Sequence, residues 1–180
     1  MLEVNVREIE EKDISHICDY WFESDHEYLH SLGVDVVKLP KREHLEQLIL
    51  DQITRPYKVT EVYVLIWEYE NKPIGHCNIN SILYSKLAYI HFHIWKQAKR
   101  KKGIGTALVK KSLPFFFENF KLKNLYCAPY AHNPAPNKVL EKLGFEFLNQ
   151  YVTTPGSINF EQEVKEWLLT REDYMKQKAE

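Results

Sequence analysis

The sequence lacks several features that would assign it to a well-defined class. Its three cysteines, Cys18, Cys77 and Cys127, are odd in number and far apart, and no CxxC pair occurs, which argues against a disulfide framework or a structural zinc site. The 24 basic and 25 acidic residues leave a formal net charge of −1, so bulk charge does not support polyanion binding. There is no apolar signal core and no apolar run of membrane-spanning length. We therefore expect a soluble cytoplasmic protein with no membrane partner.

The sequence also lacks internal repeats and low-complexity linkers, so we expect one domain over residues 1–170 and an exposed helical tail over 171–180. In chain order, the periodicity predicts a strand over 2–9, helices over 13–22, 25–31 and 40–55, strands over 62–69, 74–83 and 87–95, a helix from 104 kinked at Pro114, a strand over 122–128, a helix over 134–143 and strands over 145–151 and 160–169. This mixture indicates an α/β domain.

One segment combines consecutive cations with two glycines at the start of a predicted helix. Residues 99–102 read Lys-Arg-Lys-Lys, and Gly103 and Gly105 follow directly. Glycine lets a ligand approach the backbone closely, and the first turn of a helix offers N–H groups and partial positive charge. The segment is therefore predicted to bind a phosphorylated ligand, although it fits neither the P-loop nor the dinucleotide-binding pattern. A tight turn with a solvated basic surface is the alternative interpretation.

The strand predicted before this segment has two different faces. Because side chains alternate along a strand, Tyr89, His91, His93 and Trp95 share one face, and residues 90, 92 and 94 share the other. The second set is wholly apolar and is predicted to face the core. The first set is polar and aromatic, which is typical of a central strand that borders a cleft.

Two motifs in the second half of the chain resemble those of one enzyme family. The pattern Arg100-x-x-Gly103-x-Gly105 resembles the acetyl-CoA-binding motif of the GNAT family of N-acetyltransferases, and the block from Asn133 to Phe145 resembles their second signature. The residues from Val139 to Phe145 in this block are most similar to those of the ribosomal-protein alanine acetyltransferase branch. The resemblance covers nearly the whole chain. It implies a single-domain α/β GNAT fold, with a mixed and largely antiparallel central sheet, flanking helices and a splay between the two central strands.

The resemblance also implies a donor, acetyl-CoA. A metal site is not expected, because His91 and His93 have no evident third ligand at motif spacing. The pyrophosphate of the donor is expected on the backbone amides of the glycine segment, and its pantetheine arm between the two central strands. Asn133 would contact this arm, or would only cap the helix that follows it. The residues expected to contact the donor are Ile94, Trp95, Arg100, Lys101, Lys102, Gly103, Ile104, Gly105, Thr106 and Asn133.

Acetylation of an amine requires a neutral nucleophile, and therefore a base. The pKa of a lysine ammonium is about 10.4 and that of an α-amino group about 8, so a base of near-neutral pKa is useful. In the resembled family a glutamate on this strand often serves. Here His91 or His93 would have to replace it, because imidazole suits the task. The alternative is that both are partly buried, hydrogen-bonded histidines without a catalytic role.

The sequence departs from the family pattern at Leu140. Many members carry a tyrosine there that protonates the departing CoA thiolate, which leucine cannot do. The role is either vacant or taken by Tyr126, Tyr130 or His132, of which Tyr130 is our candidate catalytic residue. A thiol of pKa about 8.5 is a tolerable leaving group, so a dedicated acid is not essential.

In the resembled fold the early helices form the wall of the acceptor site. Trp21, Glu23 and His26 are the candidate substrate-binding residues, since acidic and aromatic groups suit a cationic amine. An amphipathic helix with a charged outer face is the plainer interpretation.

These observations favour an N-acetyltransferase that moves an acetyl group from acetyl-CoA to a primary amine, acting as a monomer or homodimer. A non-catalytic acyl-CoA sensor on the same fold is the alternative, motivated by Leu140. The basic run from Lys96 to Lys102 permits a nucleic-acid patch, but the near-neutral net charge argues against a nucleic-acid partner.

Overall fold

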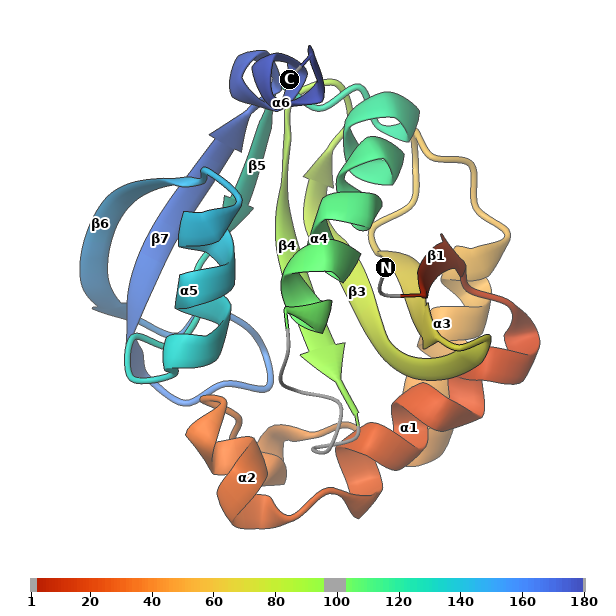
Figure 1. The fold of residues 1–180 in the computed structure, drawn as a ribbon. Coiled ribbons are helices and arrows are strands. Elements are labelled where there is room, and N and C mark those ends of the chain that lie inside the picture. The colour runs from red at the N-terminus through yellow and green to blue at the C-terminus, as the bar shows by residue number, and fades with distance from the viewer. Residues whose placement is uncertain (1–2, 96–102, 180) are drawn as a thin grey trace.

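The structure is a computed structural model that describes residues 3–95 and 103–179, with one seven-stranded sheet and helices on both of its faces (Figure 1). The strand order is β1-β2-β3-β4-β5-β7-β6, and every neighbouring pair is antiparallel except β4 with β5. The mixed, largely antiparallel sheet that the family resemblance implied is therefore confirmed. The strands are β1 (Val4–Glu8), β2 (Tyr63–Tyr69), β3 (Lys72–Leu83), β4 (Leu87–Ile94), β5 (Asn124–Cys127), β6 (Glu146–Thr153) and β7 (Gln162–Thr170).

The predicted helices are also present, with shifted ends. The third begins at Arg42 rather than at Pro40. The helices are α1 (Ile14–Glu23), α2 (His26–Ser31), α3 (Arg42–Ile53), α4 (Ile104–Pro114), α5 (Pro134–Lys142) and α6 (Arg171–Ala179). Across the described ranges, no helix is both long enough and apolar enough to cross a membrane.

The central strands are buried on both faces, and their alternation divides the core in two. On β2, Val64 and Ile66 pack with α1 and α3, whereas Leu65 and Trp67 pack with α4 and α5 on the opposite face. Figure 1 shows this layering, with α4 and α5 in front of the sheet and α3 behind it. Both helix layers pack against the sheet whose strands carry the predicted site, so these strands are held in place from both faces.

The helix after the glycine segment ends differently from its prediction. We expected Pro114 to kink a continuing helix, because proline has no amide hydrogen to donate and clashes with the preceding turn. Instead α4 stops at Pro114, and the backbone widens into a π turn over Phe115–Asn119. The wider turn lets Phe116 and Phe117 enter the core, where both are fully buried.

The C-terminal segment is helical as predicted, but it is not an exposed tail. Tyr174 of α6 is 5% exposed and stacks on Phe117, with the ring centroids 4.5 Å apart. Arg171 Nε donates to the Leu122 carbonyl at 2.8 Å, and Gln177 Nε2 donates to the Leu143 carbonyl at 3.0 Å. The prediction of exposure is therefore wrong for the side of this helix that carries Arg171, Tyr174 and Gln177.

Candidate functional site

The sheet opens in its middle, between its two parallel strands. β4 and β5 are paired from Leu87 with Asn124 only as far as Tyr89 with Tyr126. Beyond this point β4 continues along β3 and β5 follows β7, so the two strands diverge at their carboxyl ends (Figure 1). In open sheets with parallel strands, ligands bind at such carboxyl ends. The predicted splay is present in the molecule.

The start of this opening is marked by a buried side-chain contact. The thiol of Cys127 donates a hydrogen bond to the backbone carbonyl of Ile90 at 3.2 Å. Burial raises the pKa of the Cys127 thiol to about 12, so its proton is retained at neutral pH. In a regular sheet the Ile90 carbonyl would accept a hydrogen bond from a backbone amide of the neighbouring strand. Here the Cys127 side chain supplies the hydrogen bond that a buried carbonyl needs.

The N-terminus of α4 follows the carboxyl end of β4 in the chain. Gly103 is the N-cap, with φ +75°, and a Cβ added there would meet no atom of the described residues within 4 Å. The Ala107 amide bonds to the Gly103 carbonyl at 3.1 Å. The preceding amides, of residues 104–106, are in the first turn, where a helix has no carbonyl to offer them. This geometry fits the predicted anion site, but Arg100, Lys101 and Lys102 lie outside the described residues.

Gly105 has a different environment from Gly103. A Cβ at this position would lie 3.8 Å from both Ile94 Cδ1 and Val139 Cγ2, which is ordinary van der Waals contact. The described residues therefore leave room for alanine here, and alanine is the better helix former. A glycine that neither the backbone conformation nor the packing requires is consistent with close approach by a ligand.

On the β5 side of the opening, α5 begins as the sequence predicted. The Asn133 side chain accepts a hydrogen bond from the Ala135 amide at 3.3 Å, and Gly144, with φ +71°, follows the end of the helix. Leu140 is fully buried in the core, so its side chain does not border the opening. The role of Asn133 as a helix cap is confirmed, and its contact with the donor stays a prediction.

The residue that fixes this side of the opening was missed from the sequence. Asn137 is 8% exposed, its Nδ2 donates to the carbonyls of Asn133 (2.8 Å) and Tyr130 (3.2 Å), and its Oδ1 accepts from Trp167 Nε1 (2.9 Å). It therefore connects the loop after β5 to α5 and β7. The spacing of Asn137 could have indicated its burial, because a residue three positions before the apolar Leu140 lies on the same inward face of the helix.

We expect the substitution Asn137→Ala to lower the free energy of unfolding by about 2–3 kcal/mol, because one buried and two partly buried polar groups lose their partner. Urea denaturation would measure the change. Lys138→Ala is the matched control, since Lys138 is the exposed next residue of the same helix, and its effect should stay within about 0.5 kcal/mol. Equal effects of the two substitutions would contradict the role assigned to Asn137.

On the face of β4 opposite to the one that packs with α4 and α5, imidazole and aromatic rings form a cluster with α1. His93 lies opposite His76 of β3, and their rings stack with centroids 5.1 Å apart. Trp21 of α1 meets His93 edge-on at 4.9 Å, and Trp95 Nε1 donates to His76 Nδ1 at 2.7 Å. The predicted polar and aromatic face is therefore confirmed, and Trp21 lies beside one of the two candidate bases.

The second candidate base has a different environment. His91 is half-buried, with Nε2 3.1 Å from Asn80 Oδ1. Burial lowers the pKa of His91 to about 4, and burial with a smaller contribution from His91 lowers the pKa of His76 to about 3. Both imidazoles are neutral at neutral pH. A base of pKa about 4 is weak at that pH, so His91 is poorly matched to deprotonate an ammonium group.

These two lowered pKa values predict that acid destabilises the fold before its carboxylates titrate. The unfolded chain binds protons on both histidines from about pH 6.5 downward, whereas the folded chain does not. Between about pH 6.5 and 5 the free energy of unfolding should fall by roughly 2–3 kcal/mol, measured by urea denaturation at a series of pH values. The variant His91→Asn should show about half of this slope. A flat stability over the same range would contradict the burial of these rings as neutral groups.

The remaining sequence-predicted residues are spread around the opening. Glu23 and His26 are exposed at the junction of α1 and α2. Tyr126 stacks on Tyr89 within the paired part of β4 and β5, with ring centroids 5.3 Å apart. Tyr130 lies past the point of divergence, where its ring is edge-on to that of His132 at 5.2 Å. His132 itself is 70% exposed, with Nε2 3.8 Å from Glu163 Oε2.

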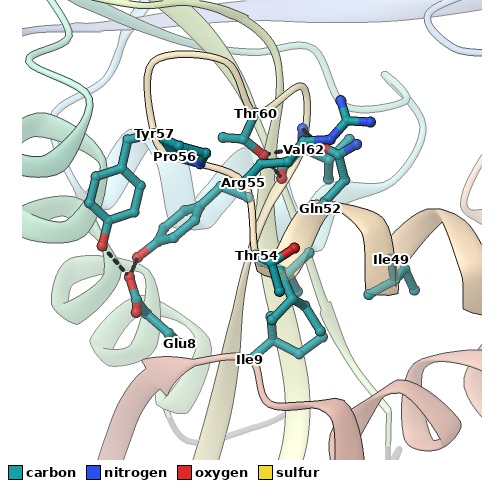
Figure 2. Close-up of a pocket in the computed structure, with 13 residues that line it drawn as sticks. Glu8, Ile9, Ile49, Gln52, Thr54, Arg55, Pro56, Tyr57, Thr60 and Val62 are labelled. Carbon is teal, nitrogen blue, oxygen red and sulfur yellow. Dashed lines mark hydrogen bonds between the residues drawn. The ribbon is translucent and has the colours of Figure 1, made fainter.

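A separate cavity of ≈290 Å³ lies at the β1 edge of the sheet, between α3 and the start of β2 (Figure 2). At its rim Glu8 Oε1 accepts hydrogen bonds from the hydroxyls of Tyr57 (2.7 Å) and Tyr63 (2.5 Å). β2 and β3 separate it from β4, so it is not part of the central opening. Within residues 3–95 and 103–179, no group of three or more His, Cys, Asp or Glu side chains could hold a metal ion.

Comparison with known proteins gives one family match. The family model described as the acetyltransferase (GNAT) domain matches residues 3–146. A search of curated proteins finds no match to the chain.

Solved structures share the fold at low sequence identity. The chain is similar to a spermidine N-acetyltransferase from Vibrio cholerae in complex with CoA and spermine, with 20% identity and a TM-score of 0.78 over 96% of this chain and 98% of that one. It is similar to a ribosomal-protein alanine acetyltransferase from Vibrio fischeri, with 18% identity and a TM-score of 0.78 over 97% and 96%. It is also similar to an aminoglycoside acetyltransferase in complex with coenzyme A, with 17% identity and a TM-score of 0.71 over 97% and 99%.

Proposed function

This chain belongs to the GNAT acetyltransferase family, and we propose that it transfers the acetyl group of acetyl-CoA to a primary amine. The observation that carries the proposal is the divergence of β4 from β5 beyond Tyr89 and Tyr126, with the first turn of α4 following β4. An opening between strands suits an extended chain such as a pantetheine arm, and the first turn of a helix suits a pyrophosphate. In support, the similar spermidine and aminoglycoside acetyltransferases are complexes with coenzyme A.

The residues of the opening fit this donor. The amides of residues 104–106 would bind the pyrophosphate, and the absence of side chains at Gly103 and Gly105 leaves the backbone accessible. Ile94 and Trp95 on one side and Asn133 on the other would contact the arm. The donor supplies an acetyl group activated as a thioester. Asn137, which holds the loop carrying Tyr130 and Asn133, would keep the second side in place.

On the acceptor side, we assign the base to His93. The imidazole first takes a proton from the ammonium. The neutral amine nitrogen then forms a bond to the acetyl carbon, the carbon–sulfur bond breaks, and a second proton lost by the nitrogen balances the one that the departing thiolate gains. His93 is the better candidate because burial lowers the pKa of His91 to about 4. Tyr130 lies past the divergence of β4 and β5 and is our candidate to protonate the thiolate. Trp21, Glu23 and His26 would line the approach of the cationic amine.

A thiol-release assay tests the proposal. Acetyl-CoA would be incubated with the protein and, separately, with spermidine, a peptide with an N-terminal alanine, and an aminoglycoside. Three structural neighbours named for these three acceptor types share the fold, which makes the panel appropriate. The proposal expects release of free coenzyme A with at least one amine. Binding of coenzyme A without release for any amine would favour the acyl-CoA sensor, the function that the buried Leu140 suggests.

A further inference from the structure

Two tyrosines that the sequence did not single out connect His93 to the surface. The Tyr20 hydroxyl lies 3.1 Å from His93 Nδ1, and it lies 3.0 Å from the Tyr28 hydroxyl. Tyr20 is on α1, Tyr28 on α2 and His93 on β4, so the three groups come from three separate elements. A continuous series of hydrogen-bond distances therefore runs from the candidate base through both helices.

The burial of the series is graded. Tyr20 is 5% exposed, and its ring meets those of Trp21 at 4.9 Å, His76 at 5.8 Å and His93 at 5.4 Å. Its hydroxyl is therefore held in position by packing, and a buried hydroxyl requires hydrogen-bond partners. Tyr28 is half-buried and lies at the outer end of the series. The inner group is thus fixed, and the outer group is the nearer to solvent.

We propose that Tyr20 is a positioning residue whose hydroxyl oxygen accepts a hydrogen bond from the Nδ1–H group of His93 and so fixes the imidazole tautomer. Tyr28 extends this hydrogen-bonded series to solvent. This inference rests on the proposed function, since it assigns the partner of the proposed base. Neutral imidazole carries one hydrogen, so a ring protonated on Nδ1 has its lone pair on Nε2. Nε2 is then the atom that takes the proton of the acceptor amine.

The proton movements balance along the series. The proton from the amine adds to His93 Nε2, the Nδ1 proton passes to the Tyr20 oxygen, the Tyr20 proton passes to the Tyr28 oxygen, and the Tyr28 proton passes to water. Each hydroxyl loses one proton and gains one, so neither tyrosine ends as a phenolate. The ring then carries its hydrogen on Nε2. Release of that proton to solvent, with return of one proton to Nδ1 through the two hydroxyls, restores the starting tautomer.

Among the residues that the structure describes, His76 is a further titratable group that faces His93, and it does not compete for this role. His76 of β3 stacks on the ring, and burial lowers the pKa of His76 to about 3, so it carries no charge near neutral pH. Its Nδ1 accepts a hydrogen bond from Trp95 Nε1 at 2.7 Å. Trp21, the neighbour on α1, has no titratable group. Within the described part of the chain, the Tyr20 hydroxyl is a titratable neighbour at hydrogen-bond distance from Nδ1.

Nitrogen-15 NMR of the histidine rings in the full-length protein tests the tautomer without requiring turnover. The wild type should show His93 protonated on Nδ1 at neutral pH, and Tyr20→Phe, which keeps the ring and removes the hydroxyl, should convert it to a mixture of tautomers. Tyr57→Phe is the matched control, because its hydroxyl binds Glu8 far from β4 in the sheet order. A wild-type His93 protonated on Nε2, or no response to Tyr20→Phe, would overturn the inference.

Kinetics with an amine that supports thiol release supply the second measurement. Tyr20→Phe should lower kcat about tenfold or more with little change in KM, and it should cause no further loss in a His93→Ala background. Equal losses in both backgrounds would mean that Tyr20 acts only through the fold, which contradicts the inference. Absence of thiol release from every amine would instead contradict the proposed function, while the NMR result would still decide the tautomer.

Discussion

Replacing Gly103 with glutamate is expected to weaken coenzyme A binding by about 100-fold or more, which corresponds to about 2.8 kcal/mol. Gly103 has φ +75°, a conformation that costs other residues about 1–2 kcal/mol. The added carboxylate would also stand next to the first-turn amides proposed to bind the pyrophosphate, where it repels the ligand's charge. Isothermal titration with coenzyme A measures the effect.

Two further substitutions separate the causes of that loss. Gly103→Asn introduces a residue that tolerates positive φ and carries no charge. This variant should therefore bind coenzyme A much better than the glutamate variant. Gly105→Ala places a methyl group 3.8 Å from its nearest neighbours. It should raise stability by about 0.5–1 kcal/mol and nevertheless weaken binding, because the methyl group blocks the approach to the backbone. Unchanged affinity in a folded Gly103→Glu variant would refute the pyrophosphate assignment.

Replacing His93 with alanine is expected to lower kcat/KM by about 100-fold or more, the usual contribution of a general base. The acidic limb of the pH profile should disappear with it, because that limb reports protonation of the base. His91→Ala is the matched control from the same strand face. It should have a smaller effect, because burial lowers the pKa of His91 to about 4 and the group is a weak base at neutral pH.

The profile of kcat/KM against pH for both variants checks this assignment. Loss of the limb in His91→Ala alone would transfer the role to His91. If neither variant changes kcat/KM or the limb, histidine does not serve as the base in this protein.

Local patterns in the sequence were sufficient for the parts of the site that local physics determines. The alternation along β4 separated the face with His91 and His93 from the core face, because a strand has a strict period of two. Gly103 and Asn133 were identified from their roles at helix ends, and the structure has each at such an end. These features depend on a few neighbouring residues, which the sequence displays directly.

The features that were missed depend on contacts between distant segments. Tyr20 meets His93 across 73 positions of sequence, and Asn137 meets Trp167 across 30. Nothing adjacent to Tyr20 or Asn137 in the chain marks these partners. The burial of Tyr174 against Phe117 also depends on a contact between distant segments. The charged residues around Tyr174 in α6 gave no sign of it. Sheet order decides such pairs, and single-sequence periodicity does not contain it.

Hydrogen exchange with and without acetyl-CoA locates the bound donor on the chain, and so tests whether the opening between β4 and β5 is the donor site. Amides at residues 103–107, at the start of α4, and at residues 127–133, after β5, should exchange more slowly when acetyl-CoA is present. The cavity at the β1 edge, bordered by Glu8 and Tyr57, should be unaffected. Protection confined to that cavity, or no protection at the central opening, would contradict the account.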